Sequence, residues 1–192
     1  MEVHLVDGTY ELFRHHFAVP SHVTAEGVEV AATRGVLGSI LRMIEDGATH
    51  VGVATDRIVE SFRNDLFVGY KTGEGIPPEL FAQFPLMEAV LEAAGFTVFP
   101  MVEFEADDAL AAAALKAAED PRVERVLVCS PDKDLAQCVT DDGRSGACEI
   151  RDSEQGPRVH DSLSLTFGHM AQGARLSRVI SRRGVQREDR RP

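Results

Sequence analysis

Short apolar runs alternate with longer amphipathic stretches along the first 140 residues, and this alternation restricts the fold of the chain most strongly. Four runs have the length and β-branched content of buried strands: residues 3–6, 50–55, 96–100 and 125–130. Three stretches between them have the apolar spacing of helices: residues 34–47, 78–95 and 105–120. Strands that alternate with helices predict an α/β fold, in which a parallel sheet carries helices on its faces.

Acidic residues follow each of the four strand-like runs. These residues are Asp7, Asp56, Glu105, Asp107, Asp108, Asp132 and Asp134. In a parallel α/β sheet the carboxyl ends of the strands form the edge at which ligands bind. We therefore expect the seven carboxylates to line one rim of the sheet.

A purely structural interpretation exists for the densest part of this set, residues 105–108. Acidic residues in the first turn of a helix interact favourably with the helix dipole, by roughly 0.3 to 1 kcal/mol each. That interpretation does not explain the other acids at the same rim, whose mutual repulsion raises their pKa values unless cations intervene. Hard divalent ions such as Mg²⁺ take oxygen ligands, and two such ions support phosphodiester cleavage. The rim therefore predicts a divalent metal site.

The segment from residue 57 to residue 78 interrupts the alternation and is too long for a tight connection. Its cations Arg63 and Lys71 are interleaved with aromatic residues, among them Tyr70. This mixture suits contact with phosphates and stacking on bases, although both cations could also be ordinary surface charges. Long loops at the ligand-binding edge of a sheet often carry function.

Composition sets broader limits on function and location. The net charge of −11 gives no general attraction for nucleic acid, although a nuclease site is itself acidic. Three cysteines without metal-ligand spacing indicate neither a zinc site nor a disulfide framework. The N-terminus has neither the apolar core of a signal peptide nor a membrane span. We expect a cytoplasmic protein with no membrane partner and no obligate protein partner.

The character of the chain changes near residue 140. The last 42 residues contain nine arginines and no lysine, and strand–helix alternation does not continue there. We therefore predict one domain over residues 1–140 and an irregular, arginine-rich tail of uncertain order over residues 141–192.

Five motifs together resemble a known family. In order along the chain they are "LVDGTYELFR", "ATD", "SFRNDLFVGYK", "EFEADDALA" and "SPDKDLAQ", and they resemble the bacterial 5′-3′ exonucleases and flap endonucleases. This family includes the nuclease domain at the N-terminus of bacterial DNA polymerase I, and the resemblance covers about residues 1–140. It implies a PIN-like (resolvase-like) domain that cleaves 5′-ended or branched DNA in replication and repair, with two Mg²⁺ or Mn²⁺ ions.

The resemblance also implies a role for each matching residue. The carboxylates around the first metal would be Asp7, Asp56, Glu105, Asp107 and Asp108. Asp132 would lie between the two metals, and Asp134 would face the second. The phosphate-contacting cations would be Arg14, Arg63 and Lys71, with Lys71 near the scissile phosphate and Tyr70 stacking on a base. Lys71, Asp132 and Asp134 would thus form the catalytic set.

The sequence departs from the family pattern in two places. Glu74 stands where family members commonly carry a basic residue, and no "GDxSDN"-like stretch follows Asp134. The second departure suggests a truncated or altered C-terminal region and an impaired second metal site. A catalytically inactive, nucleic-acid-binding form of the fold is therefore the main alternative. A haloacid-dehalogenase-like phosphatase is a weaker one, because Leu5 stands where its nucleophilic aspartate would be.

Overall fold

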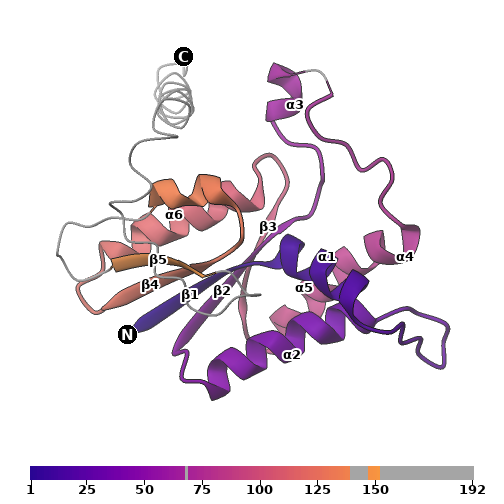
Figure 1. Cartoon of the computed structure of the whole chain (residues 1–192), viewed down its shortest axis with the longest axis horizontal. Coiled ribbons are helices and arrows are strands. Elements are labelled where there is room, and N and C mark those ends of the chain that lie inside the picture. Colours follow the sequence, from indigo (N-terminus) through magenta and orange to yellow (C-terminus); the bar gives the residue numbers. More distant parts are fainter. Residues whose placement is uncertain (68, 139–146, 152–192) are drawn as a thin grey trace, which may run out of the picture.

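The computed structural model of the chain describes residues 1–67, 69–138 and 147–151, and it contains a five-stranded sheet (Figure 1). The strands are β1 (Glu2–Asp7), β2 (His50–Asp56), β3 (Thr97–Met101), β4 (Arg125–Cys129) and β5 (Ala147–Arg151). Neighbouring strands all pair in parallel, in the order β3-β2-β1-β4-β5. The predicted α/β class with a parallel sheet is confirmed.

Helices occupy the three predicted stretches, and the described part of the chain contains further helices outside them, at residues 8–18, 63–66 and 133–138. They are α1 (Gly8–Ala18), α2 (Ala31–Glu45), α3 (Arg63–Leu66), α4 (Pro78–Phe81), α5 (Gln83–Ala93) and α6 (Ala106–Ala118), and a 3-10 helix η1 spans Lys133–Cys138. The stretch predicted as one helix over residues 78–95 forms both α4 and α5. The connection over residues 57–78, predicted as a loop, contains the short α3. No helix in the described part of the chain is long and apolar enough to cross a membrane.

Alternating side chains of the strands fill two apolar layers, one on each face of the sheet. On β1, Val6 packs in the layer under α1, α2, α4 and α5, whereas its neighbour Leu5 packs in the layer under α6 and η1. On β2, Val53 packs in the same layer as Val6, and its neighbour Ala54 packs in the same layer as Leu5. Figure 1 shows α6 on one side of the sheet and α1, α2 and α5 on the other. Helices therefore cover both faces, as the alternation in the sequence predicts.

The strand order brings β1 and β4 together at the centre of the sheet. From β1 the chain proceeds outward to β2 and β3, and it then returns to the other side of β1 to form β4 and β5. Doubly wound sheets bind ligands at such a reversal, outside the carboxyl ends of the two central strands. Val6 and Cys129 are partners in the register, so Asp7 and the residues after β4 meet at this point.

Gly8 allows α1 to begin directly after β1. A Cβ atom at this position would lie 2.7 Å from Cγ1 of Val53 and 2.9 Å from the backbone oxygen of Ala54. Real Cβ atoms do not approach backbone this closely, so only glycine fits between β1 and β2 here. The "DG" pair in the first motif is thus needed to bring Asp7 and Asp56 to the same edge.

The connection from β2 to α4 leaves the sheet, stands away from it at α3 and returns to α4 (Figure 1). We call residues 57–77, of which residue 68 lies outside the described part, the α3 segment. The fifth strand, β5, lies within residues 141–192, where sequence analysis predicted an irregular tail. The other residues of that predicted tail lie outside the described part, and the division at residue 140 stays a prediction.

Candidate active site

A cavity of about 180 Å³ lies at the carboxyl edge of the sheet. Five of the seven predicted carboxylates line it together with Lys71: Asp7, Asp56, Glu105, Asp107 and Asp132. They come from the ends of β1 and β2, the start of α6 and the turn after β4. The expected convergence of acids at one rim is therefore observed for these five residues.

The other two predicted carboxylates are not part of the cavity lining. Asp108 lies in the first turn of α6 and bonds to Arg63 instead. Asp134 is exposed on η1, and its backbone N–H donates to Oδ1 of Asp132 at 2.8 Å. Asp134 thereby helps to orient Asp132 through its backbone.

Three carboxylates surround the reversal point of the sheet, and we call Asp7, Asp107 and Asp132 the switch-point group. Asp7 caps α1 by accepting the N–H of Tyr10 at 2.9 Å, and it accepts the hydroxyl of Ser130 at 2.9 Å. Asp107 forms a hydrogen bond with Asp132. Among the described residues, no lysine or arginine forms an ion pair with this group.

The crowding raises the pKa values of two members of the switch-point group. Burial raises the pKa of Asp7 to about 6, helped by the charges of Asp56 and Asp132 and opposed by the hydrogen bonds from Tyr10 and Ser130. Burial, the charges of Asp7 and Asp132, and the hydrogen bond with Asp132 raise the pKa of Asp107 to about 8. Carboxylates in such surroundings favour either a proton or a bound cation.

Three further carboxylates have cationic partners, and we call Asp56, Glu105 and Asp108 the bridged group. Nζ of Lys71 donates to Oδ2 of Asp56 at 2.8 Å. The guanidinium of Arg63 forms two bonds of 2.8 Å with the two carboxylate oxygens of Asp108, and its Nη1 lies 3.2 Å from Oε1 of Glu105. Both cations come from the α3 segment.

Backbone groups hold the bridged carboxylates in place. Oδ1 of Asp56 accepts the N–H of Ala106 at 2.7 Å, and the N–H of Asp56 donates to the Thr9 hydroxyl at 2.8 Å. Oδ2 of Asp108 accepts the N–H of Glu105 at 3.0 Å, which forms half of a capping box at the start of α6. The end of β2 and the start of α6 are thereby joined.

The pKa values of the two cations reflect these contacts. The hydrogen bonds with Asp108 raise the pKa of Arg63, although burial opposes this. Burial alone would lower the pKa of Lys71, but the hydrogen bond to Asp56 and the charges of Asp56 and Glu105 raise it overall. Both side chains therefore stay charged near neutral pH.

The donor chemistry of the cavity fits a hard divalent cation, because its walls present carboxylate oxygens that lack full charge compensation. As the side chains stand, however, no three His, Cys, Asp or Glu residues of the described ranges are positioned to hold an ion. Asp107 is bonded to Asp132, and Lys71 is bonded to Asp56. An ion would have to replace the proton shared by Asp107 and Asp132, and it would have to move Lys71 relative to Asp56.

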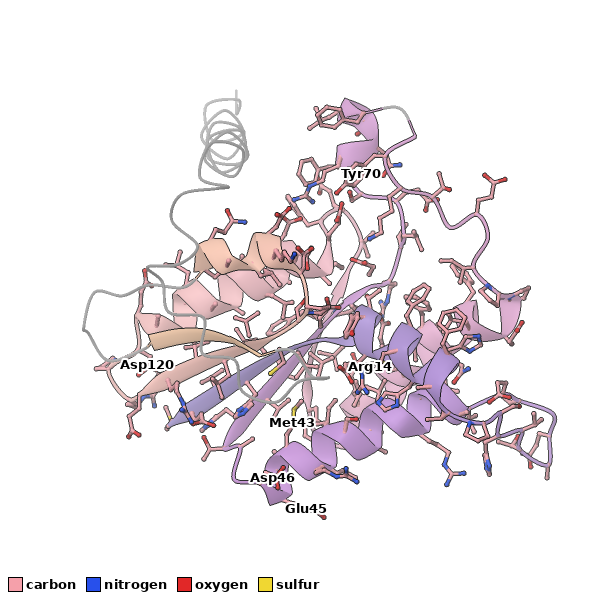
Figure 2. The ribbon with its side chains drawn as sticks, viewed as in Figure 1. Arg14, Met43, Glu45, Asp46, Tyr70 and Asp120 are labelled. Carbon is pink, nitrogen blue, oxygen red and sulfur yellow. The ribbon has the colours of Figure 1, made fainter. Side chains whose placement is uncertain are left out.

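The predicted nucleic-acid-binding residues lie in two places. Arg63, Tyr70 and Lys71 belong to the α3 segment, where Tyr70 is 47% exposed. Arg14 lies on α1, where it forms an ion pair with the buried Glu11 and is not part of the cavity lining. Figure 2 shows Arg14 at α1 and Tyr70 near α3, on separate parts of the molecule. The structure therefore does not bring Arg14 together with the other cations.

Sequence analysis missed several residues that support the site. Thr9 and Ser130 bond to the ends of β2 and β1 as described above. Glu88 on α5 is almost fully buried, and it accepts the hydroxyl of Thr55 at 2.6 Å and Nε of Arg57 at 2.8 Å. These contacts fix the backbone on both sides of Asp56. A lone acid within the apolar stretch "FPLMEAVL" was a signal for such a buried partner.

A parallel sheet with helices on both faces and an acidic cavity at its strand reversal defines a resolvase-like α/β domain. Residues 2–160 match the family described as the 5′-3′ exonuclease, N-terminal resolvase-like domain. The chain belongs to this family, and the family predicted from the five motifs is confirmed.

The chain is similar to the N-terminal parts of bacterial DNA polymerases. It is 38% identical over 139 residues to DNA polymerase I of Bacillus subtilis, covering 71% of this chain and 16% of the polymerase. With DNA polymerase I of Mycobacterium leprae it is 34% identical over 142 residues, covering 72% of this chain and 15% of the polymerase. The chain thus matches only a small part of these much longer relatives.

Solved structures of a phage nuclease share the fold. The flap endonuclease of bacteriophage T5, solved in a pseudo-enzyme-product complex with DNA and metal ions, superposes with a TM-score of 0.54 at 20% identity. That match covers 78% of this chain and 55% of the phage protein. A mutant of the T5 5′-exonuclease gives a TM-score of 0.55 at 20% identity, and the match covers 85% of this chain and 55% of the phage protein. At this level of identity the likeness concerns the fold.

Proposed function

We propose that this chain is a metal-dependent nuclease domain that hydrolyses phosphodiester bonds in 5′-ended or branched DNA, as a 5′-3′ exonuclease or flap endonuclease. The observation that carries the proposal is the cavity at the strand reversal, where five carboxylates and Lys71 converge in a member of the 5′-3′ exonuclease family. The DNA-bound T5 flap endonuclease, which shares the fold, supports DNA as the substrate.

The proposed metal ions are Mg²⁺ or Mn²⁺, and two are expected. Asp7, Asp107 and Asp132 would hold the first, with Asp56 and Glu105 beside them, and Asp132 and Asp134 would face the second. When bound, such ions supply an activated water and neutralise charge on the leaving oxygen. The carboxylate oxygens of the cavity lining and the raised pKa of Asp107 support this assignment.

The side chains of the α3 segment would receive the DNA. Lys71 stands at the cavity with a pKa above its ordinary value, so it can neutralise a phosphate placed beside Asp56. Tyr70 precedes it with an exposed ring suited to stacking on a base. We further propose that the protein acts in the cytoplasm and that residues 1–140 form the nuclease domain.

One sequence feature favours a second candidate function. No "GDxSDN"-like stretch stands between Asp134 and residue 192, and among the described residues Asp132 and Asp134 are the two carboxylates proposed to face the second metal. Weak affinity for that ion would leave a domain that binds DNA but cleaves it slowly or not at all. The inactive, nucleic-acid-binding alternative therefore stands beside the nuclease.

A cleavage assay separates the two candidates. A 5′-labelled flap DNA is incubated with the protein and Mg²⁺ or Mn²⁺, and with EDTA as control; Asp107→Asn serves as the matched variant. Metal-dependent cleavage that the variant loses supports the nuclease. Binding of the flap without cleavage supports the inactive alternative, and neither binding nor cleavage rejects both.

A further inference from the structure

Asp107 and Asp108 are adjacent acids in the first turn of α6, yet their surroundings differ. Asp107 lines the cavity and bonds to Asp132, within the switch-point group. Asp108 is absent from the cavity lining and faces Arg63 of the α3 segment. The family resemblance assigned both residues to the same metal, but this geometry separates them.

The carboxylate of Asp108 accepts three hydrogen bonds. Its Oδ1 accepts Nη2 of Arg63 at 2.8 Å, and its Oδ2 accepts both Nη1 of Arg63 at 2.8 Å and the N–H of Glu105 at 3.0 Å. A bidentate arginine–carboxylate pair is among the strongest polar contacts in proteins. A metal ion that used this residue would have to compete with these hydrogen bonds and with the positive charge of Arg63.

Arg63 is likewise held from several sides. Its side chain is only 14% exposed, its Cζ lies 4.7 Å from the centre of the Phe62 ring, and Nη1 also approaches Glu105. The Phe62 ring packs in turn against Phe104, with 5.4 Å between the ring centres. A guanidinium with these neighbours is poorly placed to reach a DNA phosphate.

The backbone of the α3 segment is attached at the same point. The N–H of Phe62 donates to the backbone oxygen of Glu103 at 2.9 Å, and the hydroxyl of Ser61 donates to Glu105 at 2.5 Å. Asn64, next to Arg63, donates through Nδ2 to the backbone oxygen of Lys71 at 2.6 Å. The backbone next to Arg63 is therefore linked through Asn64 to the backbone of Lys71, whose side chain lines the cavity.

We propose that Asp108 and Arg63 form a clasp that holds the α3 segment, and with it Lys71, over the cavity, and that Asp108 is a positioning residue rather than a metal ligand. The metal-related part of this inference rests on the proposed function, whereas the clasp itself does not. Arg63 accordingly acts on DNA through the placement of Lys71 and not through a phosphate contact of its own.

The test compares Asp108→Asn with Asp107→Asn. An asparagine at either position keeps the size of the side chain, and at 108 its oxygen can still accept the N–H of Glu105. Hydrogen–deuterium exchange without added metal reports on the amides of Phe62 to Phe67. Removing the charge partner of Arg63 should speed this exchange about tenfold in Asp108→Asn, with Asp107→Asn close to wild type.

The second readout is the rise in melting temperature on adding Mn²⁺. It should persist in Asp108→Asn and be lost in Asp107→Asn. Asp108→Glu, which restores the negative charge, should return the exchange rate toward wild type. Loss of the Mn²⁺ effect in Asp108→Asn as complete as in Asp107→Asn, or unchanged exchange in Asp108→Asn, overturns the proposal. If wild type itself shows no Mn²⁺ effect, the proposed metal site fails, and the exchange data alone then decide the clasp.

Discussion

The bridged group and the switch-point group contain the same residue types at the same rim, but they balance their charge differently. Lys71 and Arg63 lie against Asp56, Glu105 and Asp108, and the pKa values of both cations are raised. Asp7, Asp107 and Asp132 have no such cation among the described residues, and the pKa values of Asp7 and Asp107 are raised. Two cations of the chain thus offset most of the charge of one group, whereas the other group requires protons or an added cation.

The largest effect that follows from this comparison concerns pH. Without divalent ions, the native state binds protons at Asp7 and Asp107 more tightly than the unfolded chain does. The free energy of unfolding should therefore fall by several kcal/mol as the pH rises from about 4 to about 8, because both shifts act in the same direction. Urea denaturation in EDTA across this range measures the change.

Two variants isolate the source of this pH effect. Asp107→Asn should flatten the pH dependence, and Asp108→Asn should keep it. The quantity to compare is the difference between each variant and wild type, because other groups also contribute to the pH dependence of stability. Burial and the charge of Arg14 lower the pKa of His15, so His15 makes the protein more stable as the pH rises. Equal pH profiles in wild type and Asp107→Asn would mean that Asp107 does not bind a proton more tightly in the folded state, and the contrast between the switch-point group and the bridged group would fail.

The next effect concerns added metal. Millimolar Mg²⁺ or Mn²⁺ should stabilise the protein, by about 2.7 kcal/mol at a concentration 100 times the dissociation constant. Asp132→Ala removes a member of the switch-point group and should abolish the stabilisation in thermal melting. Asp134→Ala, at an exposed position outside the cavity lining, should reduce it less. A full metal response in Asp132→Ala contradicts the assignment.

A smaller effect concerns the ion pair between Glu88 and Arg57, which we expect to contribute to the stability of the fold. Glu88→Ala leaves the Thr55 hydroxyl and Arg57 without their buried partner, which should cost about 2 kcal/mol of unfolding free energy. Arg57 is 49% exposed, so Arg57→Ala should cost less than about 1 kcal/mol. Chemical denaturation gives both values. A Glu88→Ala protein as stable as wild type would show that this bridge contributes little.

The smallest effect concerns the salt dependence of DNA binding. If Lys71 meets a phosphate, Lys71→Ala should reduce the slope of log affinity against log salt by about 0.7 to 0.9. Arg63→Ala should change the slope less, because Asp108 already neutralises Arg63. Fluorescence anisotropy at several salt concentrations measures both slopes. A larger change for Arg63 than for Lys71 would place the phosphate contact at Arg63 instead.

The strands and the acids that follow them could be predicted because both signals are local. The buried runs define β1, β2, β3 and β4 to within one or two residues, and parallel pairing then brings their carboxyl ends together. The break between α4 and α5 was also readable in principle. Pro85 lies in the first turn of α5, and it lacks the N–H that a continuous helix would bond to Phe81.

The pairing of the charges could not be predicted, because it depends on how the α3 segment folds back onto α6. Arg63 and Asp108 are 45 residues apart, and Lys71 and Asp56 are 15 apart. No periodicity in the sequence shows which of seven acids a distant cation will reach. Arg14 illustrates the same limit, since its ion pair with Glu11 one turn earlier removes it from the site. The strand β5 was missed because Glu149 interrupts its sequence, "ACEIR", which therefore lacks the continuous apolar run that marked the other four strands.

The central position of β1 has a consequence for the order in which the site is completed during synthesis. Asp7 is made before every other carboxylate of the cavity, yet the hydroxyl that it accepts belongs to Ser130, 123 residues later. Asp132 follows only after that. While the ribosome produces α1 to α6, one edge of β1 has no partner strand, and such distant pairings form slowly. The nascent chain therefore has no complete acidic cavity until β4 has emerged, and the switch-point carboxylates come together only then.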